Sequence, residues 1–208
     1  MLTYRTYCLG IVQTNAYVVA NAEGTRAVII DPGTADEALM RQLDGVQVEA
    51  ILLTHAHFDH FGGVEELRKR YDCPVYLHEL EKDWLQDTVN NLSLNWPDVP
   101  EIKASPPDYL LADGQSLALC GETFRVLHTP GHSPGSVSFL VGDRLFSGDA
   151  LFRGAIGPTG MPYSDHERLV RSIREKLFAL PDSVVVLPGH GAETTIGEEK
   201  RDNPFVSV

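Results

Sequence analysis

The sequence predicts a single domain in which β-strands alternate with α-helices. Two observations predict this class: short apolar runs of strand character recur along the chain, and helix signals lie between them. A third is the length, because 208 residues suit one large hydrophobic core or at most two small ones. No repeat of fixed period and no linker-like stretch divides the chain. We therefore expect one domain over residues 1–208.

The predicted strands come first along the chain. Residues 1–7 alternate in polarity, and the apolar runs 17–19 and 27–30 are separated by the turn-forming sequence Asn21-Ala22-Glu23-Gly24, which predicts a hairpin. Further strand-like runs are residues 50–53, 75–77, 124–127, 144–148 and 184–187.

Three helices are predicted from capping signals or from the apolar pattern. They cover residues 34–43, which begin with Thr34-Ala35-Asp36-Glu37, residues 63–71, and residues 164–179, which begin with Ser164-Asp165-His166-Glu167.

Residues 79–108 form the only long stretch with weak periodicity. The stretch begins as a polar helix that carries Trp84 and continues into the proline-containing sequence around Trp96. Two interpretations remain open: a lid over a pocket, with the tryptophans supplying apolar surface, or a packed connector.

Composition narrows the class of protein. The formal net charge of −12 indicates a surface that repels nucleic-acid backbones and anionic membranes. No apolar run approaches the roughly 18 residues that span a bilayer. Residues 1–7 lack the pattern of a signal peptide, so we expect a cytoplasmic location. Cys8, Cys73 and Cys120 are far apart in apolar stretches, and we expect buried, unpaired thiols.

The most informative segment is Thr54-His55-Ala56-His57-Phe58-Asp59-His60, which follows the buried run 50–53. Three imidazoles and a carboxylate within residues 55–60 exceed what packing requires, because unpaired buried polar groups cost free energy. One or more bound metal ions explain such a cluster best. The ligands would lie on a loop between a strand and a helix.

Three later strand-like runs also lead to a potential ligand, namely His132, Asp149 and His190. If these strands share sheets and direction, their ends converge on one cleft. Five histidines and two aspartates are too many for one zinc ion, which takes about four ligands, and suit two ions. Imidazole with carboxylate suits Zn²⁺, Fe²⁺ or Mn²⁺. Two such ions would attract anions to the cleft of an otherwise acidic protein.

The pattern His-x-His-x-Asp-His, followed by distant His, Asp and His, resembles the metallo-β-lactamase superfamily. Residues 129–136, 146–154 and 187–191, with Asn203-Pro204-Phe205, are similar to the glyoxalase II-like (hydroxyacylglutathione hydrolase-like) branch. The resemblance covers nearly the full chain. It implies an α+β fold, a four-layer αββα sandwich, with two divalent metal ions, Zn²⁺ first and Fe or Mn as alternatives.

The resemblance also implies roles for individual residues. His55, His57 and His132 would bind one ion, while Asp59, His60 and His190 would bind the other and Asp149 would bridge them. A hydroxide between the ions is the expected nucleophile, with Asp59 as the catalytic proton shuttle. Asp31 matches an early aspartate of the family and is expected to orient the ligand loop through hydrogen bonds, with turn capping as the alternative.

The chain departs from the glyoxalase II pattern in two places. Only residues 191–208 follow His190, so the helical region that binds much of the glutathione in glyoxalase II is missing. Gly157-Pro158-Thr159-Gly160 stands where relatives often have Gly-Arg-Thr-Asp, which removes a cation and a carboxylate. Arg153 is then the nearest cation for an anionic substrate tail, with a structural salt bridge as the alternative.

The leading hypothesis is a dinuclear metallohydrolase that cleaves S-acylglutathione-type thioesters. The alternatives are an iron-dependent persulfide dioxygenase, a lactonase or other ester hydrolase on the same site, and a non-catalytic metal-binding scaffold. Asp59 and Asp149 set the chain apart from lactamases proper, where a cysteine commonly replaces the later aspartate. The expected partner is a small anionic or thioester substrate.

Overall fold

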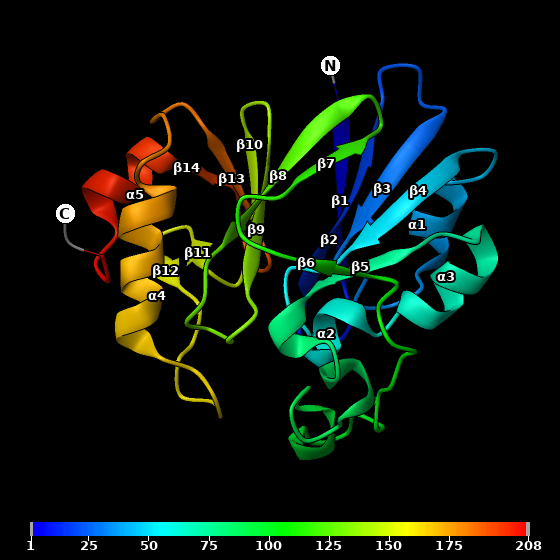
Figure 1. Ribbon diagram of the computed structural model, residues 1–208, viewed down its shortest axis with the longest axis horizontal. Helices are drawn as coiled ribbons and strands as arrows, with labels where there is room; N and C mark the ends of the chain where they lie inside the picture. Colours follow the sequence, from blue (N-terminus) through cyan, green and yellow to red (C-terminus); the bar gives the residue numbers. More distant parts are fainter. Residues whose placement is uncertain (1, 207–208) are drawn as a thin grey trace.

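Two six-stranded β-sheets face each other at the centre of the molecule (Figure 1). The computed structural model describes residues 2–206. The first sheet has the strand order β1-β2-β3-β4-β5-β6, in which β1, β2 and β3 are antiparallel neighbours and β3 to β6 run parallel. Its strands are β1 Thr3–Leu9, β2 Thr14–Ala20, β3 Arg26–Ile30, β4 Gln47–Leu52, β5 Val75–His78 and β6 Tyr109–Leu111.

The second sheet has the order β14-β13-β10-β9-β8-β7. Only β10 and β13 pair in parallel, and the other neighbours are antiparallel. Its strands are β7 Ser116–Leu119, β8 Glu122–His128, β9 Val137–Val141, β10 Arg144–Gly148, β13 Val185–Pro188 and β14 Thr194–Thr195. A separate short hairpin is formed by β11 Leu151–Phe152 and β12 Ala155–Ile156.

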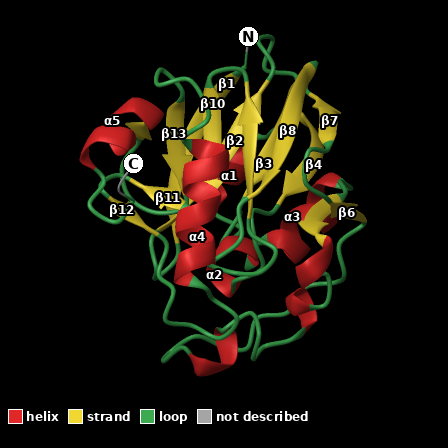
Figure 2. Ribbon diagram, turned by 60° about the vertical axis from the view of Figure 1, so that its left-hand side comes forward, coloured by secondary structure: helices red, strands yellow, loops and turns green. Residues whose placement is uncertain are grey.

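Helices cover the outer faces of both sheets (Figures 1 and 2). The first sheet carries α1 Glu37–Gln42 and α3 Val64–Tyr71, and the second carries α4 His166–Ser172 and α5 Ile196–Asp202. α2 Phe58–Phe61 is a single turn at the lower edge of the sandwich (Figure 1). The remaining turns are the 3₁₀ segments Glu79–Glu81, Trp84–Gln86 and Ser93–Asn95 and the π-helical turn Ile173–Leu177.

The side chains of single strands show how the layers separate, because successive residues of a strand point to opposite faces. Ile29 of β3 packs in one buried cluster with Leu39 of α1, whereas its neighbour Ile30 packs in another with Phe139 of the second sheet. On the far side, Leu145 of β10 joins a third cluster with residues of α4. Three cores between four layers confirm the predicted α+β, four-layer αββα sandwich.

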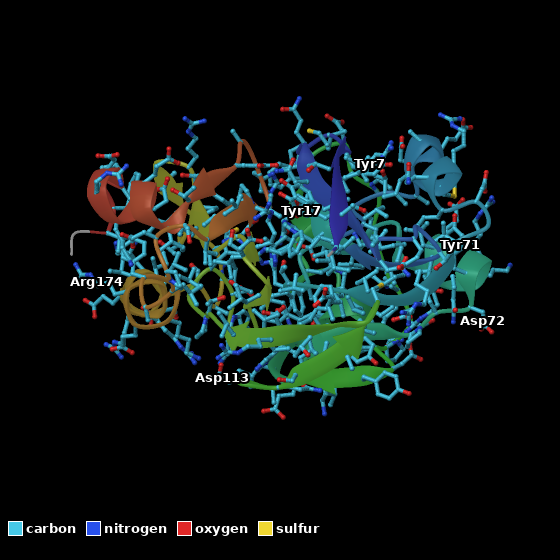
Figure 3. All side chains as sticks on the ribbon, turned by 90° about the horizontal axis from the view of Figure 1, so that it is seen from above. Tyr7, Tyr17, Tyr71, Asp72, Asp113 and Arg174 are labelled. Atoms are coloured by element: carbon cyan, nitrogen blue, oxygen red, sulfur yellow. The ribbon has the colours of Figure 1, made fainter. Side chains whose placement is uncertain are left out.

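Tyr17 of β2 shows how the two sheets are joined in the middle. Its ring is buried and meets Phe146 edge-on, with 5.1 Å between ring centroids, and its hydroxyl donates to the Pro188 carbonyl at 2.6 Å. In the view from above, Tyr17 lies near the centre of the molecule, while Asp72 and Arg174 mark its opposite ends (Figure 3).

The predicted hairpin over residues 17–30 is confirmed, since Asn21 Oδ1 accepts hydrogen bonds from the backbone amides of Thr25 and Arg26. The predicted helix starts need correction. α1 is capped by Asp36, whose carboxylate accepts from two backbone amides, and not by Thr34. α4 is capped by Asp165. In both cases an aspartate carboxylate nearer the helix provides the cap.

Helix α5 was not predicted. Thr195 and Glu198 form a reciprocal capping box at its start, so the capping signal was present in the sequence. The expected long helix to Ala179 also differs, because α4 changes to a π-helical turn at Ile173.

Residues 79–108 pack over α2 at the base of the molecule (Figure 1). The backbone amide of Phe58 donates to the Asn91 carbonyl at 2.9 Å, and that of Ala104 donates to Leu85 at 2.8 Å. Asn91 is fully buried. These contacts are those of a packed connector, and its Trp84 reaches the ligand cluster described below.

The strands that lead to the candidate ligands do not share one sheet. β4 belongs to the first sheet, and β8, β10 and β13 belong to the second. Their ends nevertheless meet, because the backbone amide of Val137 donates to the Thr54 carbonyl at 2.8 Å and that of Asn15 donates to Gly189 at 2.7 Å. The two sheets are thus hydrogen-bonded to each other at the edge that carries the ligands.

The three cysteines are free, and Cys73 and Cys120 are buried. Cys8 is exposed, which corrects the expectation of a buried thiol, because it points outward from the edge strand β1. Among residues 2–206, none of the helices has the length and apolar character needed to cross a bilayer.

Candidate metal centre

The first group of candidate ligands lies where β4 leads into α2. His55 and His57 are buried, and His55 Nε2 lies 3.0 Å from His57 Nδ1. His132, which follows β8, brings its Nε2 to 2.9 Å from the same His57 nitrogen. Its other nitrogen, Nδ1, lies 2.9 Å from the Pro158 carbonyl, which fixes the ring. Three imidazoles thus turn one nitrogen each toward a common point.

A second group lies beside the first. Asp59 Oδ2 lies 3.4 Å from His60 Nε2 and 3.3 Å from His190 Nε2. The Thr14 hydroxyl donates to the same Asp59 oxygen at 2.6 Å. His60 is fully buried, whereas Asp59 and His190 are partly accessible. This side of the cluster is therefore the one that faces outward.

Asp149 lies between the two groups. Its Oδ1 is 3.4 Å from His60 Nε2, and its Oδ2 is 3.5 Å from His132 Nε2 and 3.6 Å from His190 Nε2. Gly189 makes room for this carboxylate, because a Cβ at that position would lie 2.2 Å from Asp149 Oδ1. The structure therefore brings together all seven predicted ligands.

The donor set fits bound metal ions. Ligand atoms that lie ~2.1 Å from one tetrahedral ion are about 3.4 Å from each other, which is close to the spacings found here. Within residues 2–206, His60 Nε2 and Asp149 Oδ1 are buried without any hydrogen-bond partner. Buried polar atoms rarely remain unpaired, so a cation between them accounts for both. The His and Asp clusters indicate a dinuclear metal site.

Asp31 supports the ligand loop from behind. Its Oδ1 accepts from the Thr54 backbone amide at 2.8 Å, and its Oδ2 accepts from the Thr54 hydroxyl at 2.6 Å. Oδ2 also lies 3.0 Å from His60 Nδ1. A proton on Nδ1 leaves Nε2 of His60 free to face the cluster, so Asp31 selects the ring tautomer that can bind an ion.

The histidines of the first group are held neutral. Burial lowers the pKa of His57 to about 3, with the neighbouring His132 adding to the shift. Burial likewise lowers the pKa of His132, and it lowers the pKa of His55 well below its usual value. Neutral imidazole is the form that binds metal, so this group is ready to bind without losing protons.

In the second group, the histidine pKa is raised and not lowered. Burial opposes the charge of His60, but the carboxylates of Asp59 and Asp149 outweigh it and raise its pKa well above the usual value. Burial alone would raise the pKa of Asp149, yet the positive His60 beside it lowers that pKa to about 2. The raised pKa favours a proton on the His60 ring, and a metal ion bound by this ring would displace that proton.

Arg153 lies in the turn of the β11–β12 hairpin, directly after Phe152, whose ring centroid is 6.0 Å from that of His190. Its side chain is exposed, and its charge adds to the Thr194 hydrogen bond in lowering the pKa of Glu198 at the start of α5. Both interpretations of Arg153, a substrate contact and a structural salt bridge, therefore stay predictions.

Two residues beside the cluster, Thr14 and Glu81, were not predicted from the sequence, and Trp84 was expected only as apolar surface over a pocket. Thr14 binds Asp59, Glu81 binds the loops that carry His55, His57 and His132, and Trp84 stacks on His57 with 6.3 Å between ring centroids. Each lies far from its partner along the chain and carries no local motif, so only the fold brings them together.

Comparison with known proteins places the cluster in context. A family model described as "Metallo-beta-lactamase superfamily" matches residues 9–190. Among curated relatives, "Probable metallo-hydrolase YqgX" of Bacillus subtilis is 41% identical over 99% of this chain and 98% of its own length. "Hydroxyacylglutathione hydrolase GloC" of Haemophilus influenzae is 37% identical over 87% of each chain.

Two solved structures are similar over almost the whole chain. BLEG-1, described as a B3 metallo-beta-lactamase, has a TM-score of 0.94 and 46% identity, covering 99% of this chain and all (100%) of that one. TTHA1623, solved in a di-iron-bound form, has a TM-score of 0.85 and 42% identity, covering 97% of this chain and 100% of that one.

Proposed function

Because this chain belongs to the metallo-β-lactamase superfamily, we propose that it is a dinuclear metal-dependent hydrolase that cleaves thioesters of the S-acylglutathione type. One observation carries the proposal: two complete groups of ligand atoms, His55/His57/His132 and Asp59/His60/His190, lie on either side of Asp149. The presence of the second group supports two ions and therefore hydrolysis.

When bound, two divalent ions supply an activated water at neutral pH and polarise the substrate carbonyl. The chain's own residues fix the geometry in which that chemistry occurs. Asp31 sets the ring orientation of His60, and Thr14 holds Asp59 through Oδ2. Held in this way, the Asp59 carboxylate would take up the proton that is released on hydrolysis. Trp84 packs against His57 and keeps water from that side of the site.

The thioester specificity is supported by similarity to GloC, which is named a hydroxyacylglutathione hydrolase. The test is to load the purified protein with Zn²⁺ or Fe²⁺ and to follow the loss of thioester absorbance with S-lactoylglutathione. We expect turnover well above background, and none with Asp149→Ala. Background turnover by wild-type protein with both metal sites filled would contradict thioester specificity.

A β-lactam is the second candidate substrate. Asp59 and Asp149 led us to separate the chain from lactamases proper, but BLEG-1, at 46% identity, is described as a B3 metallo-beta-lactamase. A chromogenic cephalosporin assayed beside the thioester decides between the two. Faster turnover of the cephalosporin, in kcat/KM, would replace the thioester assignment while leaving the metallohydrolase assignment intact.

An iron-dependent persulfide dioxygenase is the third candidate, because iron suits this ligand set. Such an enzyme would differ from both hydrolases in requiring one iron per chain and in consuming oxygen. Oxygen uptake with glutathione persulfide by a chain that holds a single iron would favour it over both hydrolases.

A further inference from the structure

Glu81 is a fully buried carboxylate that lies outside the ligand set. It ends the 3₁₀ turn that follows β5. Its Oε2 accepts a hydrogen bond from the Ala56 backbone amide at 2.7 Å, and its Oε1 accepts from the Gly135 amide at 2.7 Å. The Ser133 hydroxyl also donates to Oε1. All three donors therefore come from other segments of the chain.

Those donors identify what Glu81 holds. Ala56 stands between His55 and His57, and Ser133 directly follows His132. The first of these loops leaves the first sheet through β4, and the second leaves the second sheet through β8. One carboxylate thus connects the two loops that together supply the three-histidine group.

The fit between Glu81 and the second loop is close. A Cβ at Gly135 would lie 2.8 Å from Glu81 Cγ, so the glycine is what allows the backbone to approach the carboxylate. Ser133 and Ser136 also share a hydrogen bond of 2.7 Å, which orders the turn around Glu81. The position of His132 therefore depends on a turn that is built around this side chain.

The charge of Glu81 is also informative. Burial raises the pKa of its carboxyl, and the three hydrogen-bond donors oppose that shift. Within residues 2–206, no Lys or Arg forms an ion pair with it. A buried carboxylate without a cationic partner costs free energy, and a cation bound by the adjacent histidines would offset part of that cost.

We infer that Glu81 is a positioning residue that holds His55, His57 and His132 in metal-binding geometry, so that its loss weakens that metal site selectively. The inference depends on the metal centre of the proposed function and not on the substrate. The other group of ligands, Asp59, His60 and His190, has no hydrogen bond to Glu81 in the described structure. Metal affinity at that site therefore serves as the internal reference.

The test is the Glu81→Gln variant, which keeps the size of the side chain. A glutamine presents an NH₂ group where a backbone amide or the Ser133 hydroxyl now donates, so one bond at least is lost. Glu79→Gln is the matched control, because Glu79 is exposed on the same 3₁₀ turn. Both variants are titrated with Co²⁺ against a competing chelator, and the visible spectrum after one equivalent is recorded.

Two reference variants identify the site that is lost. His132→Ala disables the three-histidine group, and His190→Ala disables the other. After one equivalent of Co²⁺, we expect the visible spectrum of Glu81→Gln to match that of His132→Ala, because both variants should bind the first ion at the other site. The affinity of the three-histidine site should be lowered about 10- to 100-fold. The other site should stay within about twofold, and Glu79→Gln should match wild type.

Equal weakening of both sites, or wild-type affinity at both, in a folded Glu81→Gln protein would overturn the inference. If that variant does not fold, Ser133→Ala tests the inference instead, because it removes one hydrogen-bond donor to Glu81 and leaves both backbone donors in place. It should weaken the three-histidine site by about threefold to tenfold, and unchanged affinity would overturn the inference. Co²⁺ binding is measured without substrate, so failure of the thioesterase assay leaves this result unaffected.

Discussion

His60 Nε2 and Asp149 Oδ1 lie 3.4 Å apart, and in the described structure neither atom has a hydrogen-bond partner. Leaving a buried polar atom unpaired costs about 1–3 kcal/mol. The ligand cluster contains two such atoms on facing side chains, one from the loop after β4 and one from the end of β10. Since the two sheets hold these atoms in place, the fold itself maintains a position that a cation can occupy.

Gly189→Ala should disrupt this position directly. The new Cβ would lie 2.2 Å from Asp149 Oδ1 and 2.8 Å from His60 Cε1, so the Asp149 carboxylate must move. We expect metal content to fall by at least one ion per chain, and hydrolase activity to fall about 100-fold or more. Metal analysis and turnover measure the two effects.

The matched control for that variant is Gly160→Ala. Gly160 has open space around its Cβ position and no left-handed backbone conformation. It should keep wild-type metal content. A Gly189→Ala protein that still binds two ions would show that Asp149 does not lie between them.

Asp31→Asn tests the support of the ligand loop. Asp31 has a φ of 49°, which asparagine also tolerates, so the backbone should be preserved. In this variant only one side-chain oxygen at position 31 remains to accept hydrogen bonds from Thr54 and His60. The new NH₂ group points toward groups that are themselves hydrogen-bond donors. We expect the metal-free protein to lose about 1–3 kcal/mol of stability. Metal affinity should fall about 10- to 100-fold.

Urea unfolding and chelator competition measure these two losses. Asp36→Asn at the cap of α1 serves as control, since asparagine caps helices as well as aspartate does. Equal behaviour of the two variants would mean that Asp31 has only a capping role.

The two metal sites should respond differently to pH. Carboxylates raise the pKa of His60, and the Asp59 carboxylate raises that of His190 against the effect of burial, whereas burial lowers the pKa of His55, His57 and His132. A raised pKa means that the ring holds a proton below that pKa, and metal binding must displace it. As pH falls, the site that contains His60 and His190 should therefore weaken first.

Each displaced proton changes metal affinity about tenfold per pH unit. Co²⁺ titrations between pH 8 and pH 5 should show the steeper slope at the Asp59/His60/His190 site. Equal slopes, or a steeper slope at the three-histidine site, would contradict the assignment of the protonated histidines.

Trp84 should report on metal binding through its fluorescence. Its ring lies nearly parallel to His57, whereas Trp96 packs on Phe58 with 5.5 Å between ring centroids. An ion bound to His57 changes the charge beside Trp84, which stacks on that ring. The change in emission on adding Zn²⁺ should persist in Trp96→Phe and disappear in Trp84→Phe. A signal that survives in Trp84→Phe would place the ion elsewhere.

The sequence predicted which His and Asp side chains lie together, because a metal centre leaves a chemical pattern. The spacing from His55 to His60 and the strand-like runs before His132, Asp149 and His190 depend on local sequence alone. The hairpin around Asn21 was predictable for the same reason, since its turn uses the side chain of that residue. Fold class followed from resemblance, and the three separate cores confirm it.

The supporting residues could not be predicted, because their partners are distant along the chain. Glu81 contacts Ala56 and Gly135, which are 25 and 54 residues away. Thr14 is 45 residues from Asp59. The observed helix starts differ from the predicted ones because more than one polar residue near each start could serve as the N-cap.

Metal analysis of the purified wild-type protein beside Asp149→Ala tests the central claim most directly. We predict about two divalent ions per wild-type chain, and about one or fewer in the variant together with loss of hydrolysis. A wild-type chain that binds only one ion with every site residue intact, or an Asp149→Ala protein that keeps both ions and full activity, would contradict a two-metal hydrolytic centre.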